Sequence, residues 1–416
     1  ARQAGIDEKI RFDRRVVAAS WSSAEARWTV TVESGAGERE TITCSFLWMC
    51  SGYYRYDQGY TPEFPGIEDF EGEVIHPQHW PEELDYAGKK VVVIGSGATA
   101  VTLVPALAAE AAKVTMLQRS PTYIVSVPGE DAVANWLRRA VGERRAYALV
   151  RWKNVALQSF FYRLSRRRPR LMRKVIRRGA VRALPPGYDV DTHFNPRYNP
   201  WDQRVCLVPD SDLFKALADG SAEIVTDTIA GFDEGGIELE SGRRLEADVV
   251  VTATGLNLLF LGGAQLTIDG EEVDLGRRFT YKGMMLSGVP NLVFTIGYTN
   301  ASWTLKADLV AEYTCRLLNH MQAGGYDVCA PEVSDPALGE EPLLDFTSGY
   351  VLRSLAELPK QGSKEPWKLR QNYPLDLCSL RHGPVDDQMR FGRAAEEAIN
   401  SGESAQGDAA LAGSSA

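Results

Sequence analysis

The sequence lacks the cysteine patterns that mark disulfide scaffolds and structural zinc sites. Its six cysteines, at positions 44, 50, 206, 315, 329 and 378, include no C-x-x-C pair. Thiols this sparse favour a reducing compartment, so we expect a cytoplasmic protein without a metal site. The missing dithiol also disfavours a disulfide reductase. A serine hydrolase is disfavoured because there is no G-x-S-x-G and only five histidines are present.

A net positive charge and long hydrophobic runs are absent as well. The formal net charge is −9 at pH 7, which disfavours a nucleic-acid-binding protein. The longest uncharged stretches, 249–268 and 283–305, are interrupted by Gly, Thr and Asn and indicate buried strands rather than membrane spans. No signal peptide opens the chain, and because its first residue is Ala1 we expect it to start partway into a gene product.

What is present is the composition of an ordinary globular protein. The 416 residues are 44% hydrophobic and 24% charged. A valine-rich strand at 91–94 precedes Gly95-Ser96-Gly97, an Ala-rich helix to about residue 112, and a second strand at 114–117. Strand, glycine turn, helix and strand form a βαβ unit, which is typical of a doubly wound parallel sheet.

A weak internal repeat suggests two domains of this kind. Residues 25–52 and 223–255 each show a hairpin pattern, an apolar strand and then Ser-Gly or Thr-Gly. In the first copy, strands at 25–33 and 39–50 form the hairpin. We therefore predict an α/β fold with two Rossmann-like dinucleotide-binding domains. Apolar residues at helical spacing also predict an amphipathic helix over 303–322.

The segment Gly95-Ser96-Gly97-Ala98-Thr99-Ala100 fits G-x-G-x-x-G/A. Its first glycine allows a tight turn, its second lets backbone amides approach a pyrophosphate, and Ala100 is small enough for the helix to pack on the strand. The helix N-terminus adds the positive end of its dipole. The motif lies between a predicted strand and a predicted helix, as dinucleotide binding requires.

The end of the following strand indicates which dinucleotide binds. An NAD site usually has an acidic residue there, but this strand ends Leu117-Gln118-Arg119-Ser120. An arginine can pair with a 2′-phosphate, which an acidic residue would repel. We therefore expect NADP(H), bound by Arg119 and Ser120, although a surface role for Arg119 stays open.

A second motif is more specific. Phe70, Gly72, His76, Trp80 and Pro81 form the pattern F-x-G-x-x-x-H-x-x-x-W-P. Together with L-Q-R-S-P-T-Y from 117, A-T-G from 253 and N-P-W-D-Q-R from 199, this resembles the Baeyer–Villiger monooxygenases, most closely the branch of the ethionamide-activating enzymes. The resemblance extends from residue 1 to about 380.

The resemblance implies an enzyme that uses FAD, NADPH and O2. In this family a C4a-peroxyflavin attacks a ketone to give an ester or lactone, and sulfides or thioamides are oxygenated at sulfur. The implied domains are an FAD-binding part at 1–63, an NADPH domain at 64–222 with a helical excursion at 126–186, and a return to the FAD domain at 223–335. A C-terminal extension at 336–400 and a disordered tail at 401–416 follow.

The resemblance also implies roles for individual residues. Arg204 would stabilise the anionic oxygenating species, and His76 would act as a positioning residue that couples domain motion to catalysis. Thr254 and Gly255 would bind cofactor at the mouth of the FAD domain. Val16 and Asn300 would contact FAD, with 297–300 beginning the segment under its ring system. Strand-end turns and a surface ion pair of Arg204 are the structural alternatives.

One family feature is missing. Members begin with a strand and a glycine motif for the FAD pyrophosphate, whereas the G-x-G-x-x-A at residue 95 is the single such motif here. We therefore expect the chain to begin after that βαβ unit. A truncated, catalytically inactive NADP(H)-binding fragment is accordingly the alternative to the enzyme.

Residues 138–182 reverse the charge of the chain. They contain sixteen Lys and Arg and one acidic residue, Glu143, a local charge of +15, with aromatic residues interleaved. A solvated helical excursion explains this pattern. So does a basic amphipathic surface that docks on an acidic partner or peripherally on the anionic inner face of a membrane.

Overall fold

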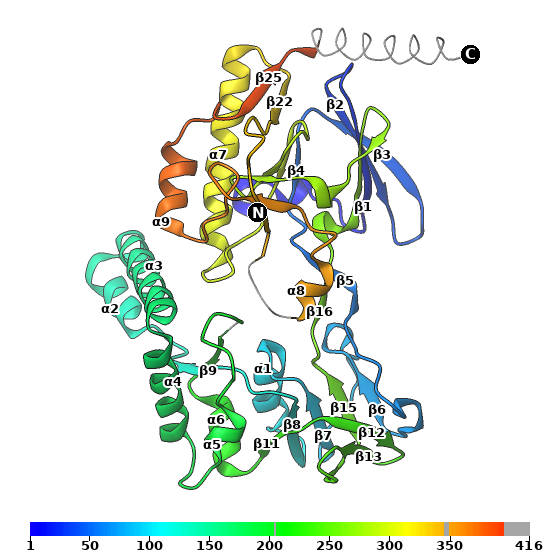
Figure 1. The fold of residues 1–416 in the computed structure, drawn as a ribbon, viewed down its shortest axis with the longest axis vertical. Coiled ribbons are helices and arrows are strands. Elements are labelled where there is room, and N and C mark those ends of the chain that lie inside the picture. The colour runs from blue at the N-terminus through cyan, green and yellow to red at the C-terminus, as the bar shows by residue number, and fades with distance from the viewer. Residues whose placement is uncertain (204, 345–348, 395–416) are drawn as a thin grey trace. The chain divides into compact units, whose positions relative to one another are not determined.

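The computed structural model describes residues 1–203, 205–344 and 349–394. The chain divides into two compact units (Figure 1). The first unit comprises 1–54, 258–345 and 353–416, and the second comprises 55–257 and 346–352. Two strands through which the chain passes between the units, β5 (Tyr54–Gly59) and β16 (Leu256–Leu258), pair with each other.

The second unit is built on a five-stranded parallel sheet in the order β11-β8-β7-β15-β6. These strands are β6 (Glu73–Ile75), β7 (Lys90–Ile94), β8 (Lys113–Gln118), β11 (Ala222–Thr226) and β15 (Val249–Thr252). Helix α1 (Ala98–Leu107) connects β7 to β8, which gives the predicted βαβ unit.

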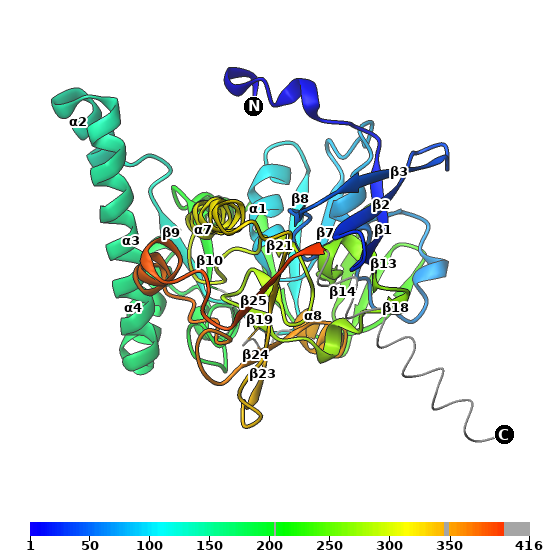
Figure 2. The same ribbon diagram turned by 90° about the horizontal axis from the view of Figure 1, so that it is seen from above.

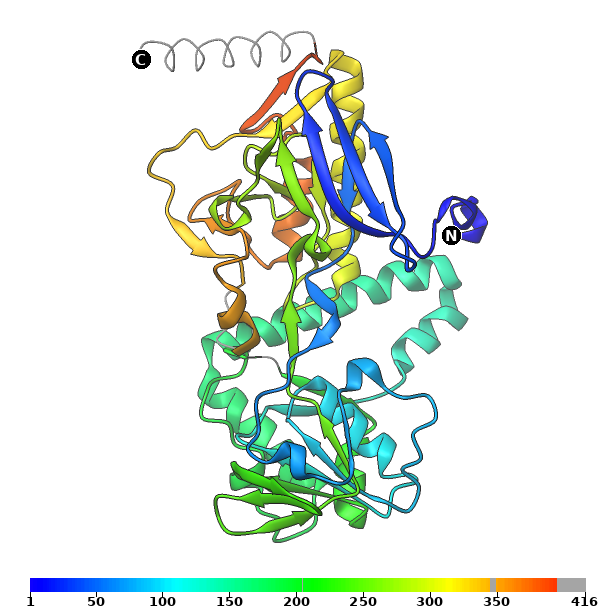
Figure 3. The same ribbon diagram turned by 90° about the vertical axis from the view of Figure 1, so that its right-hand side faces the viewer.

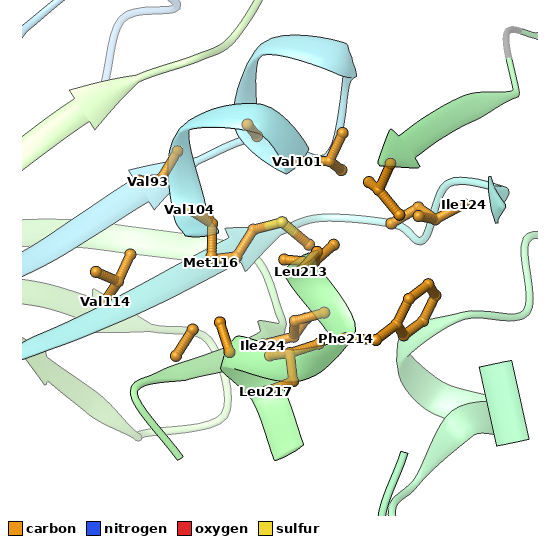
Figure 4. Close-up of a cluster of buried hydrophobic side chains, with 14 of the residues drawn as sticks. Val93, Val101, Val104, Val114, Met116, Ile124, Leu213, Phe214, Leu217 and Ile224 are labelled. Carbon is orange, nitrogen blue, oxygen red and sulfur yellow. The ribbon is translucent and has the colours of Figure 1, made fainter. Parts of the chain in front are cut away.

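Valines at alternate positions of β7 face two different layers, because successive strand side chains point to opposite faces. Val91 and Val93 pack against α1 and α6 (Asp212–Asp219) in one core, part of which Figure 4 shows. Val92 and Ile94 pack in a second core beneath an antiparallel meander. The meander consists of β12 (Ile229–Asp233), β13 (Gly236–Leu239) and β14 (Arg244–Glu246).

The basic segment forms a helical insertion between two short parallel strands, β9 (Ile124–Val127) and β10 (Cys206–Pro209). Gly142, with a φ of 79°, separates α2 from α3, and Pro169 begins α4. Figure 2 shows α2, α3 and α4 following one another along this insertion. The helices are α2 (Ala132–Val141), α3 (Glu143–Arg167), α4 (Pro169–Ala183) and α5 (Val190–His193).

The first unit contains a five-stranded sheet in the order β18-β17-β1-β2-β3, whose long antiparallel strands are drawn in blue in Figure 3. Trp21 and Trp28 are buried in it at 1% and 0% exposure. The strands are β1 (Arg15–Ser22), β2 (Arg27–Glu33), β3 (Arg39–Cys44), β17 (Gln265–Ile268) and β18 (Glu271–Glu272).

A parallel pair of strands and a long helix form the other half of the first unit. Strand β4 (Leu47–Met49) pairs with β21 (Leu292–Phe294), which precedes α7 (Trp303–Gly324). Helix α7 matches the helix predicted over 303–322. The remaining elements are β19 (Thr280–Tyr281), β20 (Met285–Leu286), β22 (Val328–Pro331), β23 (Glu340–Pro342), α8 (Gly349–Ser354), β24 (Lys360–Gly362), α9 (Tyr373–Asp376), a π-helix (Leu377–His382) and β25 (Met389–Gly392).

Sequence-based boundaries differ from the structure at the domain ends and in one strand. The first unit ends at residue 54 rather than 63, and the chain returns to it at 258 rather than at 223, because β11 and β15 lie in the sheet of the second unit. The single strand expected over 39–50 is divided into β3 and β4, and β4 leaves the hairpin to pair with β21. The apolar run 46–50 that ends this segment does not reveal which sheet it joins. The expected tail at 401–416 lies outside the described residues.

Candidate functional site

The turn after β7 brings the backbone of Gly95 against a neighbouring strand end. Gly95 has a φ of 134°, and its amide donates to the carbonyl of Leu117 at 2.8 Å. A Cβ at this position would lie 2.3 Å from the carbonyl oxygen of Ala253, which follows β15. The backbone conformation and the close approach both require glycine here.

The start of α1 leaves backbone amides open to a ligand. Gly97 is the N-cap residue and provides no side-chain cap, and the amide of Val101 donates to its carbonyl at 3.1 Å. Ala98, Thr99 and Ala100 form the first turn, with Ala100 fully buried against the sheet. A Cβ on Gly97 would meet no atom within 4 Å. Uncapped amides at the positive end of a helix dipole, with clear space in front, fit a phosphate group.

Ser96 links this turn to the end of the adjacent strand. Its hydroxyl lies 2.8 Å from Thr122 Oγ1 and donates to the carbonyl of Ser120 at 3.1 Å. Arg119 and Ser120 directly follow β8 and are exposed. Within the described ranges, no residue forms an ion pair or hydrogen bond with the Arg119 guanidinium. The guanidinium is thus available to an anionic group beside the turn.

The apolar positions of the F-x-G-x-x-x-H-x-x-x-W-P motif shape the edge of this sheet. Phe70 is 8% exposed, and a Cβ on Gly72 would lie 2.4 Å from Phe70 Cζ and 2.5 Å from the carbonyl of Asp248. Trp80 packs against the core beneath α1, while Pro81 is exposed. These residues hold β6 in place, and β6 leads directly to His76.

The imidazole of His76 contacts β5 and Gly255, the residue before β16. Nδ1 accepts a hydrogen bond from the amide of Gln78, and Nε2 lies 3.2 Å from the carbonyl of Gly255. The neutral ring therefore carries its proton on Nε2, because a carbonyl oxygen only accepts. A Cβ on Gly59, in β5, would lie 2.0 Å from ring atom Cε1. His76 thus packs on β5 and on the residue that precedes β16.

Thr254 and Gly255 lie at the carboxyl edge of the sheet in the second unit, and their cofactor-binding role stays a prediction. They follow β15, which pairs with β7 and so ends beside the Gly95 turn. Thr254 Oγ1 donates to the carbonyl of Tyr60 at 2.6 Å. Gly255 has a φ of 117° and accepts the amide of Tyr60 at 3.1 Å.

Arg204 lies outside the described residues, but the chain on either side of it is described. Asp202 pairs with Arg166 of α3 at 2.9 Å, and the ring of Trp201 lies 5.4 Å from that of Tyr162. Burial raises the pKa of the nearby Tyr198 to about 12, so its hydroxyl stays protonated.

The two residues expected near FAD, Val16 and Asn300, lie in the first unit. Val16 is in β1 and pairs with β2. The side-chain amide of Asn300 donates to the carbonyl of Gln371 at 3.0 Å, just before α7 begins. The N-cap residue Ser302 bonds to Thr304 Oγ1 at 2.8 Å and caps no backbone amide. The open start of this long helix fits an electron-rich ring edge.

Sequence reasoning missed several residues that hold these segments. Thr122 belongs to the L-Q-R-S-P-T-Y motif but was given no role, although it follows β8 at the sheet edge that carries the glycine turn. Gln371 had no such signal, since it lies 71 residues from Asn300 in the sequence. In the described part of the chain, no three His, Cys, Asp or Glu side chains form a group that could hold a metal ion.

Comparisons with known proteins identify the family. A model described as flavin-binding monooxygenase-like matches residues 1–137. FAD-containing monooxygenase EthA of Mycobacterium tuberculosis is 58% identical over 391 residues, which are 94% of this chain and 80% of that protein. The probable FAD-binding monooxygenase AlmA of Acinetobacter baylyi is 49% identical over 384 residues, 92% of this chain and 77% of that protein. The solved structure of an oxidized steroid monooxygenase bound to NADP superposes with a TM-score of 0.69 at 21% identity, over 94% of this chain and 83% of that chain.

The chain belongs to the flavin-binding monooxygenase-like family, in the Baeyer–Villiger branch that contains EthA. It is an FAD-dependent monooxygenase. The predicted fold class of two Rossmann-like dinucleotide-binding domains and the predicted FAD are confirmed, and the steroid monooxygenase of the same fold was solved with the other predicted cofactor, NADP.

Proposed function

We propose that this monooxygenase inserts one oxygen atom next to the carbonyl of a small ketone and forms an ester or lactone. Ketone, O2, NADPH and one proton give the ester, NADP+ and water. Sulfides and thioamides form a second substrate class, oxygenated at sulfur with the same balance. The observation that carries the proposal is the position of His76, which lies within a complete F-x-G-x-x-x-H-x-x-x-W-P segment and contacts both β5 and Gly255, the residue before β16.

We assign NADP(H) to the second unit. The amides at the start of α1, from Ala98 to Ala100, would take the pyrophosphate, and Gly95 and Gly97 let the backbone approach it. Arg119 and Ser120 would bind the 2′-phosphate at the end of β8.

We assign FAD to the first unit. Val16 and Asn300 would contact it, and the open amides of α7 would face the electron-rich edge of the ring. FAD held there would supply the oxygen-activating chemistry, which no side chain provides. His76 acts as a positioning residue rather than a proton donor, because both ring nitrogens are already engaged.

Arg204 would stabilise the negative charge that develops on the transferred oxygen. A guanidinium suits this role because it stays charged at every working pH and donates in a fixed fork. In Arg204→Ala, oxygenation should be abolished while reduction of the flavin by NADPH remains measurable by stopped-flow absorbance. Arg197→Ala, an exposed arginine of the same loop, is the matched control and should keep product formation. Normal product formation in Arg204→Ala would contradict the role.

The decisive experiment is a visible spectrum of the purified chain with FAD, followed by turnover. A flavin band that survives desalting, with O2-dependent ester formation from an aliphatic ketone by mass spectrometry, supports the proposal. A flavin-bound chain that oxidises NADPH but forms only hydrogen peroxide with ketones, sulfides and thioamides contradicts it. A colourless chain that binds NADPH supports the alternative of an inactive NADP(H)-binding module.

A peripheral membrane contact of residues 138–182 is favoured by one further observation. Large aromatic side chains stand exposed among the arginines of this segment and of α2, and charge complementarity points to an anionic bilayer. They are Trp136, Tyr147, Trp152, Phe160 and Phe161. No helix in the described ranges is both long and apolar enough to span a membrane.

Pelleting with phosphatidylglycerol vesicles tests this contact. Replacing four basic side chains of the insertion by glutamine should reduce the pelleted fraction, because each contributes to attraction to the anionic surface. These residues are Arg163, Arg167, Arg170 and Arg178. The matched control carries the same change at Arg2, Arg11, Arg39 and Arg277 and should bind like the parent chain. Equal binding of both variants would dismiss the contact.

A further inference from the structure

A buried ion pair joins α7 to the C-terminal part of the first unit. Lys306 Nζ donates to Asp376 Oδ2 at 2.8 Å and to the carbonyl of Lys282 at 3.1 Å. The two side chains are only 2% and 13% exposed. The same Asp376 oxygen accepts the hydroxyl of Tyr298 at 2.8 Å. One carboxylate is therefore shared between α7 and the segment that precedes it.

Gln371 adds two hydrogen bonds to that segment. Its Oε1 accepts the amide of Thr299 at 2.9 Å, and its carbonyl accepts the side chain of Asn300. Each of the three residues from Tyr298 to Asn300 is therefore bonded to residues 371–376.

The residues flanking this segment are packed as closely. A Cβ on Gly297 would lie 2.1 Å from Trp303 Cγ, and the Trp303 ring lies 5.2 Å from that of Tyr53, which follows β4. The start of α7 is thus held against the ends of both parallel strands, β4 and β21. Burial next to Asp376 also raises the pKa of Tyr298, so its hydroxyl remains a donor.

A buried ion pair adds little stability over a well-packed apolar pair, because desolvation offsets the attraction. Its better-attested contribution is geometric specificity. We propose that Lys306, Asp376 and Gln371 are positioning residues, which hold Tyr298–Asn300 and the start of α7 in a single backbone position. The claim that this backbone position serves the flavin rests on the proposed function. The claim that these residues hold the segment in place does not depend on it.

Amide hydrogen exchange of the purified chain without flavin tests the holding. In Lys306→Met and in Asp376→Asn, the amides of 298–300 should exchange at least about tenfold faster. The reason is that the segment can then open locally without breaking the ion pair and the hydrogen bonds that hold it. Gln371→Ala should speed exchange of Thr299 in particular. The control is Glu312→Gln, which removes the more exposed Glu312–Arg381 pair between α7 and the π-helix. Unchanged exchange at 298–300 in Asp376→Asn would overturn the proposal.

The double variant Lys306→Met/Asp376→Leu separates positioning from stability and covers the case in which the single variants fail to fold. It should unfold at a denaturant concentration near that of the parent chain, because a matched apolar pair replaces both charges. Exchange at 298–300 should nevertheless stay fast, since the Tyr298 hydroxyl has lost its acceptor. Fast exchange supports positioning, and a return to the parent rate shows that the pair only fills space.

Flavin release is measured separately, by the recovery of free FAD fluorescence. Release should be at least about tenfold faster in Asp376→Asn than in Glu312→Gln, a difference of about 1.4 kcal/mol. Equal release with faster exchange would overturn the flavin part of the proposal and leave the holding intact. Failure of the parent chain to bind FAD would contradict the proposed function, and the exchange experiment would still decide whether the segment is held.

Discussion

The two units of this chain shape their candidate cofactor segments by different means. In the second unit, Gly95 and Gly97 make the turn themselves, and the sheet beneath requires only that they carry no side chain. In the first unit, Tyr298–Asn300 is held by side chains about seventy residues further along the chain. A local turn depends on a few backbone angles. A segment held from a distance depends on the folding of everything that supports it.

Removing one charge of the buried pair should have the largest effect and tests whether the first unit depends on long-range contacts. Lys306→Met should lower the free energy of unfolding by about 3–5 kcal/mol, because it leaves the Asp376 carboxylate buried without its cation. Urea unfolding followed by circular dichroism measures the loss. The exposed-pair variant Glu312→Gln should lose less than about 1 kcal/mol. Similar losses in both variants would show that burial of the Lys306–Asp376 pair is unimportant.

The glycine turn predicts a split between stability and binding. Gly95→Ala should destabilise the chain by about 2 kcal/mol, since it combines an unfavourable φ with a clash at Ala253. Gly97→Ala should change stability by less than about 0.5 kcal/mol, because open space surrounds that position. Both should weaken NADPH binding. Thermal unfolding and a fluorescence titration with NADPH measure the two effects, and tight NADPH binding by Gly97→Ala would contradict the assigned pyrophosphate position.

A cofactor comparison sharpens the assignment of the second unit. Arg119→Ala should weaken NADPH binding by about 1.5–3 kcal/mol, because one charge-assisted hydrogen bond to the 2′-phosphate is lost. NADH binding should change little. Isothermal titration with both nucleotides checks this, with exposed Arg182→Ala as the control. Equal weakening for the two nucleotides would rule out a 2′-phosphate contact.

The smallest expected effect is a pH dependence of the second unit. Burial lowers the pKa of His193, whose Nδ1 lies 2.8 Å from Thr226 Oγ1. The unfolded chain therefore takes up this proton first as the pH falls below about 6.5. Stability is present above that pH and declines toward the folded-state pKa. Melting temperatures between pH 7.5 and 5 should fall less in His193→Gln, and identical slopes would show that this histidine does not contribute.

The local parts of this picture were predictable from the sequence. The βαβ unit, the turn from Gly95 to Ala100 and the helix α7 follow from patterns of spacing within about thirty residues. The structure places Arg119 beside the glycine turn, as the motif expects, because strand ends of a parallel sheet meet at one edge. Whether Arg119 binds a 2′-phosphate stays a prediction.

The long-range parts were not predictable, for a physical reason. The return of the chain to the first unit was expected at residue 223 and occurs at 258, because two Rossmann-like halves have the same local pattern and only strand order tells them apart. The division of 39–50 into β3 and β4 was missed because the sequence of a strand does not show which other strand it pairs with.

By itself, the sequence determined the class of fold, the dinucleotide turn and the family, since these depend on residue types at short, fixed spacings. The tertiary structure alone decided which strands are neighbours, that His76 meets Gly255, and that Lys306 meets Asp376. The two side-chain contacts join residues 179 and 70 positions apart. No spacing rule encodes them, because only the folded chain brings such residues together.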